Sequence, residues 1–180
     1  MPGSDPILRL GSDPGRVATW LLAGWLIAGC APSGVTWEPV EPPPAAPDFE
    51  LAQLDGGQVR LSGLRGRVVV MEFWATWCGP CRYSTPSLEA IYRKYRDQGV
   101  TVLLINQAES PTRIQKWAEG RFTAPILLDV EQVVARQYRV TGLPTLFVID
   151  RQGMIRYHEA GYSGGLEHNL QLIFQELLAA

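Results

Sequence analysis

The sequence predicts an α/β domain in which helices flank a mixed β-sheet and an antiparallel hairpin precedes the sheet. Apolar runs at 68–73 and 100–105 are typical of strands that are buried on both faces, and a segment with helical periodicity separates them. A strand–helix–strand unit of this kind forms a parallel pair with a right-handed crossover. Two later strands, expected at 146–150 and 155–159, are joined by the short turn 151–153 and add an antiparallel part.

The elements before the second buried strand follow from turn and helix signals. Residues 49–54 and 59–61 flank the tetrapeptide DGGQ at 55–58, which favours a β-hairpin turn. Between the two buried strands, apolar residues recur at helical spacing, and Gly99 is expected to end that helix. These apolar residues are Leu88, Ile91, Tyr92 and Tyr95.

The second half of the chain is expected to contain three more helices. Residues 112–119 and 133–138 have the character of short helices and lie on either side of the short apolar segment 126–129. The last segment carries one apolar helical face, which consists of Leu166, Leu170, Ile173 and Leu177. No internal repeat interrupts this order of elements, so a single domain is expected.

Composition limits the classes of function. The chain has 180 residues, of which 46% are hydrophobic and 19% are charged, as is ordinary for one globular domain. The formal net charge is −2 and no basic block is present, so nothing favours nucleic-acid binding. Three cysteines are too few for a disulfide-dense scaffold, and their odd number leaves one thiol outside any pair.

Residues 1–29 are expected to be a signal peptide. Arg9 and Arg16 precede the apolar run 17–28, which is shorter than the about 20 residues that a membrane-spanning helix needs. The run ends in IAGC, which resembles the lipobox of bacterial lipoproteins and implies that Cys30 is a lipid anchor. An uncleaved signal anchor with an incidental cysteine is the alternative. Either reading predicts an extracytoplasmic protein, in a periplasm or on the outer face of the cell membrane, where disulfides persist.

Residues 30–47 are expected to form a linker between the lipid anchor and a folded domain that covers residues 48–180. The segment is rich in proline, which has no backbone N–H to donate to a helix or a sheet. We therefore expect an extended spacer. The alternative is that residues 35–40 pack on the domain.

The stretch WATWCGPCRY contains Cys78 and Cys81, separated by Gly-Pro. A closed zinc site takes four ligands, and the other candidates, which are Cys30, His158 and His168, do not have the spacing to complete one. A permanent disulfide across so short a loop would add little stability through loop entropy. Redox chemistry is the remaining role for the pair.

The expected strand-to-helix turn suits a redox role. With a helix that begins at about 78–81, Cys78 lies at the helix N-terminus, where free N–H groups and the helix dipole stabilise a thiolate. Cys81 follows one turn later on the same face, within the reach of a disulfide. Gly79 is expected to permit a tight turn, and Pro80 suits a first helical turn, where its missing N–H would have no partner.

The segment FWATWCGPCR resembles the active site of the thioredoxin superfamily, whose fold is a three-layer sandwich with a central mixed sheet. With the leading hairpin, the proline-rich tether and the signal sequence, residues 48–180 are similar to the membrane-anchored TlpA/ResA-type thiol–disulfide oxidoreductases, which carry an AhpC/TSA-redoxin-like domain. A second motif, VTGLPT at 140–145, resembles the cis-proline loop of the family.

The resemblance implies an enzyme that reduces disulfides in exported proteins, such as apocytochrome c, through the Cys78–Cys81 dithiol. Cys78 would attack as the more exposed thiol, and Cys81 would resolve the mixed disulfide. Glu72 stands where thioredoxins carry a buried Asp, and strand alternation points it beneath the disulfide. Burial would raise the pKa of its carboxyl group and suit it to proton exchange with Cys81. The alternative places Glu72 in solvent at a strand edge.

The resemblance also implies a surface that binds the substrate. Trp77 is expected to offer an apolar contact beside Gly79 and Pro80, and the backbone of Leu143 and Pro144 is expected to pair with an extended substrate segment.

The direction of electron flow follows from the dipeptide between the cysteines. Gly-Pro is the pair found in reducing thioredoxins, whose potential is about −270 mV. A reductase in an oxidising compartment needs a membrane protein that supplies electrons. The resemblance implies no bound cofactor. The chain reads CRYS at 81–84, where many relatives read CRxE, and this difference leaves the choice of substrate open.

Three other readings remain as alternatives. A peroxiredoxin shares the fold, but its Pro-x-x-x-Thr-x-x-Cys motif is absent from the sequence. A copper-delivery protein of this fold would carry Cys-x-x-x-Cys with a distal His ligand, and the spacing here is one residue shorter. A redox-inert binding module tethered to the membrane is the third, and the intact cysteine pair argues against it.

Overall fold

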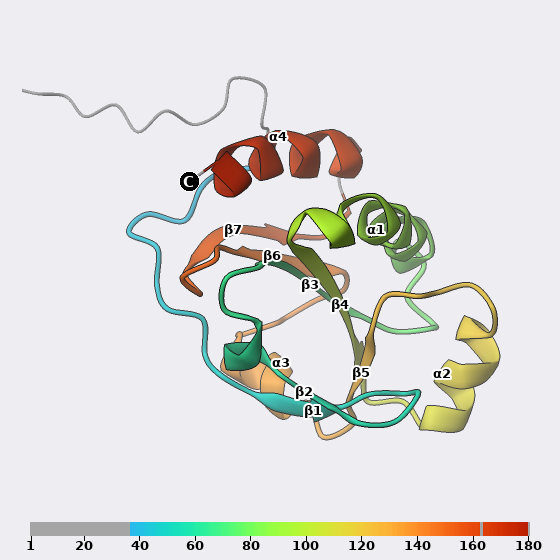
Figure 1. The fold of residues 1–180 in the computed structure, drawn as a ribbon. Coiled ribbons are helices and arrows are strands. Elements are labelled where there is room, and N and C mark those ends of the chain that lie inside the picture. The colour runs from blue at the N-terminus through green and yellow to red at the C-terminus, as the bar shows by residue number, and fades with distance from the viewer. Residues whose placement is uncertain (1–36, 163, 180) are drawn as a thin grey trace, which may run out of the picture.

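The computed structural model describes residues 37–162 and 164–179. Five strands form the central sheet in the order β5–β4–β3–β6–β7 (Figure 1). Strands β3, β4 and β5 run parallel, and β6 and β7 are antiparallel to their neighbours. The sheet is therefore mixed, as the sequence predicts. Its strands are β3 (Val68–Trp74), β4 (Val100–Gln107), β5 (Ile126–Asp129), β6 (Thr145–Ile149) and β7 (Ile155–Ala160).

Helices cover both faces of the sheet and make three layers (Figure 1). Helices α1 (Cys81–Tyr95), α2 (Pro111–Ala118) and α4 (Leu166–Ala179) share one buried apolar cluster with the sheet. Helix α3 (Val133–Gln137) shares the cluster on the other face with residues of the N-terminal region. The predicted hairpin is present as β1 (Glu50–Ala52) and β2 (Gln58–Arg60), and two 3-10 turns, η1 (Leu61–Leu64) and η2 (Arg96–Gln98), complete the fold.

Strand β3 sets the arrangement of the core because all of its residues are buried. Successive side chains of a strand point to opposite faces. Val70 and Trp74 accordingly pack on the side of α1 and α4, and Val69 and Phe73 pack on the side of α3. Glu72 has the parity of Val70 and Trp74, so a carboxyl group lies within the apolar layer beneath α1.

Residues 37–47, the N-terminal strap, lie along the outer edge of β7, so the packed domain begins upstream of the expected start at residue 48. The strap pairs with β7 at Pro39–Tyr157 and at Ala45–Met154. The N–H of Ile155 donates to the carbonyl oxygen of Pro44 at 2.8 Å. A proline cannot donate to a strand, but its carbonyl still accepts. The part of the predicted linker within the described residues therefore packs on the domain, as the alternative reading had it, and covers an exposed sheet edge.

The predicted signal peptide and the predicted lipid anchor Cys30 lie outside the described residues. Within the described ranges, no helix combines the length and the apolar character needed to cross a membrane.

Replacing Trp37 by Ala tests whether the strap belongs to the domain. The Trp37 side chain is 4% exposed and packs in the cluster that contains α4. Trp37→Ala should lower the free energy of unfolding by about 3–5 kcal/mol, measured by urea denaturation. Glu38→Ala, one residue along at an exposed position, should change it by less than about 0.5 kcal/mol. A detached spacer would leave both variants as stable as the wild type.

Candidate active site

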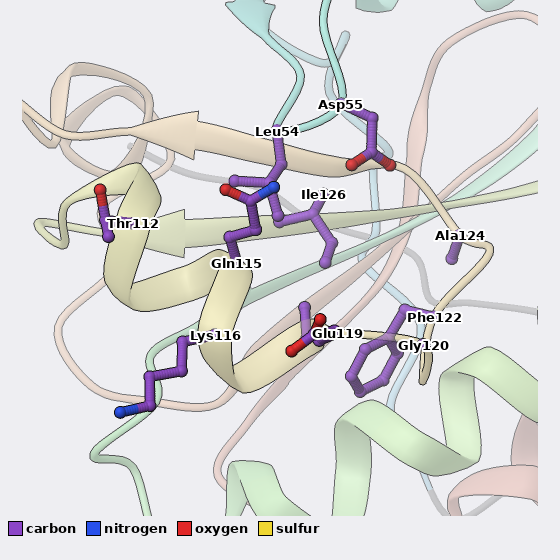
Figure 2. Close-up of a pocket in the computed structure, with 11 residues that line it drawn as sticks. Leu54, Asp55, Thr112, Gln115, Lys116, Glu119, Gly120, Phe122, Ala124 and Ile126 are labelled. Atoms are coloured by element: carbon purple, nitrogen blue, oxygen red, sulfur yellow. The ribbon is translucent and has the colours of Figure 1, made fainter.

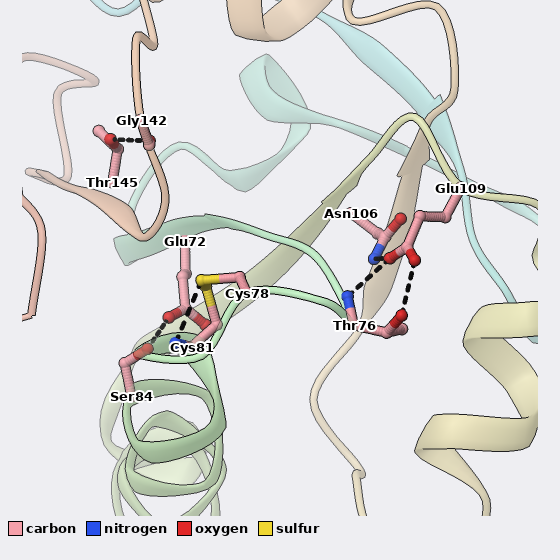
Figure 3. The surroundings of a disulfide bond; sticks show 9 residues. All are labelled: Glu72, Thr76, Cys78, Cys81, Ser84, Asn106, Glu109, Gly142 and Thr145. Atoms are coloured by element: carbon pink, nitrogen blue, oxygen red, sulfur yellow. Dashed lines mark hydrogen bonds between the residues drawn. A yellow bond between two sulfur atoms is a disulfide. The ribbon is translucent and has the colours of Figure 1, made fainter.

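Cys78 and Cys81 form a disulfide at the point where β3 passes into α1 (Figure 3). Their Cα atoms are 5.3 Å apart, within the range that a disulfide requires. Cys81 is the first residue of α1, and its N–H donates to Cys78 Sγ over 3.2 Å. The first turn of the helix thus directs a hydrogen-bond donor and the positive end of its dipole at the sulfur of Cys78.

The two residues between the cysteines both support the start of the helix. The carbonyl oxygen of Gly79 accepts the N–H of Arg82, and that of Pro80 accepts the N–H groups of Tyr83 and Ser84, so both residues accept the first hydrogen bonds of the helix. Gly79 has no positive φ, and a Cβ built on it would meet no atom within 4 Å. Gly79 permits the turn, but the turn does not require a glycine at this position. Both residues are exposed, so the surface beside the Cys78 sulfur carries small side chains and is open to solvent.

Cys78 is less exposed than the resemblance implied. It is 3% exposed and Cys81 is 1% exposed, and both belong to the buried cluster that contains Trp74. In the oxidised protein the two sulfurs are thus almost equally covered. The Cys81 N–H contacts the sulfur of Cys78, and Glu72 and Ser84 lie beneath Cys81, so the surroundings of the two sulfurs differ.

Glu72 lies beneath the first turn of α1, as strand alternation predicted, and is fully buried. The Ser84 hydroxyl, three residues after Cys81, donates to Glu72 Oε1 (Figure 3). Glu72 Oε2 has no hydrogen-bond partner among the described residues. Burial raises the pKa of Glu72 to about 8, against the opposing effect of the Ser84 and Thr85 hydroxyls. The carboxyl group is therefore mostly protonated near neutral pH and gives up its proton only slightly above it.

A second buried carboxylate holds the loop that leads to Cys78. Thr76 donates its N–H to Glu109 Oε2 at 2.7 Å and its hydroxyl to Oε1 at 2.6 Å. The Asn106 amide and the Arg113 guanidinium also contact this carboxylate, at 2.9 and 3.0 Å. Burial acts to raise the pKa of Glu109, but the hydrogen bonds from Thr76 and Asn106 and the charge of Arg113 together outweigh it, so the pKa is lowered. Glu109 thus remains a carboxylate that fixes the loop from β3 to α1.

Sequence reasoning missed Glu109. It follows β4 and is 33 residues from Thr76, and no motif links the two. One signal was available, because residues that follow parallel strands β3 and β4 meet at the same edge of the sheet.

The loop before β6 lies beside the end of β3. Phe73 of β3 is paired with Thr145 of β6, so Pro144 lies alongside the end of β3, just before the loop to Cys78. The Leu143–Pro144 peptide bond is cis, the form that the resemblance implied. The Thr145 hydroxyl donates to the carbonyl oxygen of Gly142 at 2.8 Å and holds the loop closed (Figure 3). Leu143 makes no backbone hydrogen bond within the described residues, so its N–H and carbonyl are available to another chain.

The two tryptophans near the disulfide have different surroundings. Trp77 is 63% exposed, whereas Trp74 is fully buried and packs against Trp117 with ring centroids 4.6 Å apart. Trp77 borders a hollow of about 240 Å³, whose other walls include Val140 and Leu143. The exposed Trp77, Leu143 and the disulfide are thus brought to one place, and Cys30 is the predicted site residue that lies outside the described part.

A larger hollow, of about 520 Å³, lies between α2 and the turn of the β1–β2 hairpin (Figure 2). None of the predicted site residues lines it; its walls include Leu54, Asp55, Lys116 and Phe122. Across residues 37–162 and 164–179, no group of three or more His, Cys, Asp or Glu side chains is arranged to hold a metal ion.

Comparisons with known proteins agree with this geometry. A model of the AhpC/TSA family matches residues 44–158, more than half of the chain. Thiol-disulfide oxidoreductase ResA from Geobacillus thermodenitrificans is 42% identical over 113 residues, which are 62% of this chain and 64% of that protein. The match therefore spans less than two thirds of the relative's length.

Two solved structures have the same fold. A thiol:disulfide interchange protein assigned as DsbE, from Chlorobium tepidum, is 33% identical with a TM-score of 0.70, and the match covers 76% of this chain and 96% of that one. The exposed lipoprotein thioredoxin Etrx1 from Streptococcus pneumoniae is 28% identical with a TM-score of 0.65, over 73% of this chain and all of the other. The thioredoxin-like three-layer fold with an N-terminal hairpin is thus confirmed.

The burial of Glu72 predicts a pH-dependent stability. Because the pKa is raised from 4.5 to about 8 in the folded state, the unfolded chain releases this proton first. The free energy of unfolding should therefore fall as the pH rises from 4.5 towards 8, by up to about 1.4 kcal/mol per pH unit. Glu72→Gln should remove this slope, measured by urea denaturation of the oxidised protein at pH 5 and pH 8. Equal slopes in the wild type and the variant would show that the carboxyl group is ionised in the folded state.

Proposed function

Because the chain belongs to the AhpC/TSA family and is a thioredoxin-like protein of TlpA/ResA type, we propose that it is an extracytoplasmic thiol–disulfide oxidoreductase that reduces disulfides in exported proteins. One observation carries the proposal: the Cys78–Cys81 disulfide lies at the start of a helix and above a buried carboxyl group with a raised pKa. The relatives named as oxidoreductases support the same chemistry.

The reaction begins with the reduced dithiol. The Cys78 thiolate, stabilised by the N–H of Cys81 and the start of α1, attacks one sulfur of a substrate disulfide. A bond forms between Cys78 Sγ and that sulfur, the substrate disulfide breaks, and the second substrate sulfur leaves as a thiolate that takes up a proton from water. The product is a mixed disulfide.

The second step closes the bridge within the protein. In the fraction of molecules in which Glu72 is ionised, its carboxylate takes the thiol proton of Cys81, and the Cys81 sulfur attacks Cys78 Sγ. The Cys78–Cys81 bond forms, the mixed disulfide breaks, and the substrate leaves with both of its sulfurs reduced. Two electrons have passed to the substrate. The pKa of Glu72, about 8, lies close to the ordinary pKa of a thiol, so the proton moves between the two groups at little cost.

The protein needs a reductant to repeat the cycle. A membrane protein that carries a dithiol on the outer side of the membrane would attack the Cys78–Cys81 disulfide and return two electrons. Apocytochrome c, whose haem-attaching cysteines must be reduced, is one exported substrate of the proposed class. Lipid attachment at Cys30 would keep the domain beside such a donor, and the relative Etrx1 is itself named as an exposed lipoprotein.

A peroxiredoxin is the second candidate because the AhpC/TSA family match is compatible with it. Glu72 and the one-turn spacing of the cysteines favour exchange with a disulfide. Rates with hydrogen peroxide and with oxidised insulin distinguish the two, and faster consumption of peroxide would favour the peroxiredoxin.

Trapping with the resolving thiol removed tests the proposed function directly. Cys81→Ser should form covalent adducts with exported proteins that are released by dithiothreitol, because a mixed disulfide at Cys78 then has no internal thiol to resolve it. The same variant should lose insulin reduction to the background rate. Cys78→Ser is the matched control and should trap nothing.

Adducts at Cys81 in the Cys78→Ser variant would reverse the assigned roles of the two thiols. If neither variant forms adducts while the wild type is inactive on insulin, the redox-inert binding module is the correct reading.

A further inference from the structure

Three aromatic side chains are exposed in the described part of the chain; two of them, Trp77 and Tyr83, lie within two residues of the cysteines, and the third, Tyr162, follows the residue that bonds the cis-proline. Trp77 is 63% exposed, Tyr83 is 68% exposed and Tyr162 is 40% exposed. The rings of Tyr83 and Tyr162 stack, with centroids 6.2 Å apart and planes at 24°. Two tyrosines that meet in solvent form a flat apolar surface at a point where the proposed chemistry has no use for them.

The topology places the tyrosine stack and Trp77 on opposite sides of the disulfide. Tyr83 lies in the first turn of α1, two residues after Cys81. Tyr162 follows β7, and the N–H of the preceding Gly161 donates to the carbonyl oxygen of Pro144 at 2.8 Å. The stack therefore lies on the β7 side of the cis-proline loop. The hollow beside Trp77 lies on the β4 side, because Gln107 at the end of β4 also borders it.

The free backbone of Leu143 lies between these two surfaces. An unpaired N–H and carbonyl at the end of a sheet pair best with a polypeptide in extended conformation. A segment that pairs there would carry its cysteine to Cys78, and its flanking side chains would point towards Trp77 on one side and towards the tyrosines on the other. A small disulfide without a backbone would reach the sulfur but not the stack.

We propose that Tyr83 and Tyr162 form a docking surface for an apolar side chain that neighbours the target cysteine in an extended segment of a protein substrate. This inference rests on the proposed function, because it defines which disulfides the same site prefers. The surface is continuous with the atom to which the partner becomes bonded, and the exposed rings offer area that only a neighbouring side chain can cover. It also gives a role to Tyr83, an exposed aromatic side chain two residues after Cys81.

Binding and turnover with matched peptides test the proposal. Two peptides of equal length each contain one cysteine, and the residue two positions from that cysteine is Phe in one peptide and Ser in the other. Turnover is measured with the peptides as linear disulfides. Binding to the oxidised protein is measured with versions in which Ser replaces the cysteine. Tyr83→Ser/Tyr162→Ser should raise KM for the Phe peptide, and its Kd, about tenfold with kcat unchanged. The Ser peptide and hydroxyethyl disulfide should change by less than about twofold.

The control is Val130→Ser, which removes an exposed apolar side chain, 46% exposed, that lines a different hollow. It should behave as the wild type with all substrates. Equal losses on the Phe peptide, the Ser peptide and hydroxyethyl disulfide in the tyrosine variant would overturn the proposal in favour of a structural role. An unchanged preference for Phe would overturn it as well.

The binding measurement separates this inference from the proposed function. If the wild type reduces none of the disulfides but still binds the Phe peptide through the two tyrosines, the docking surface stands and the oxidoreductase assignment fails. If turnover is normal and binding does not depend on the tyrosines, the oxidoreductase assignment stands and the docking surface fails.

Discussion

The chemistry proposed for the site depends on one contact, the hydrogen bond from the N–H of Cys81 to Cys78 Sγ at the start of α1. The first N–H groups of a helix have no partner within the helix, and here one of them is directed at a sulfur. The same turn supplies the second cysteine at the separation that a disulfide needs. The two cysteines are almost equally buried, and the helix start directs its N–H at the sulfur of Cys78.

The surroundings of this contact keep it in place. Glu109 holds the loop before Cys78 through both the N–H and the hydroxyl of Thr76, from the end of the neighbouring strand. Glu72 lies on the opposite side of the disulfide, within the apolar layer, and its only hydrogen-bonded oxygen contacts Ser84. Glu109 is surrounded by hydrogen-bond donors and stays ionised, whereas Glu72 lacks such a set of donors and stays mostly protonated. The two carboxyl groups thus differ in charge: Glu109 holds the loop as a carboxylate, and proton exchange with Cys81 is the role proposed for Glu72.

Local patterns in the sequence predicted the sheet, the helices, the pairing of Cys78 with Cys81 and the place of Glu72, whereas the cis-proline loop was expected from the resemblance to the thioredoxin superfamily. Buried strands have a strong apolar signature, and strand alternation is enough to place Glu72 beneath the helix. The CGPC and VTGLPT motifs predicted that the cysteines and Pro144 lie close together, because both motifs fall at strand ends that the topology brings to one edge of the sheet.

Other features depend on contacts between distant segments and could not be read from local sequence. The N-terminal strap contains prolines that argue against a strand, yet the Pro44 carbonyl accepts from Ile155, the Val40 N–H donates to Arg156, and Trp37 packs in the core. The Glu109–Thr76 contact and the Tyr83–Tyr162 stack also join segments far apart in the chain. Gly79 suggested a tight turn, but its φ is not in the positive range that favours glycine. Its small size therefore matters only at the surface.

Titration of the reduced protein measures the central contact most directly. The ultraviolet absorbance of thiolate, followed against pH in the wild type and in Cys81→Ser, reports the ionisation of Cys78. The account predicts a first transition clearly below the ordinary thiol value of about 8.5, assigned to Cys78 because it persists in the variant. Two transitions at or above that value would contradict the account, because the helix start would then leave the sulfur of Cys78 no more acidic than a free cysteine.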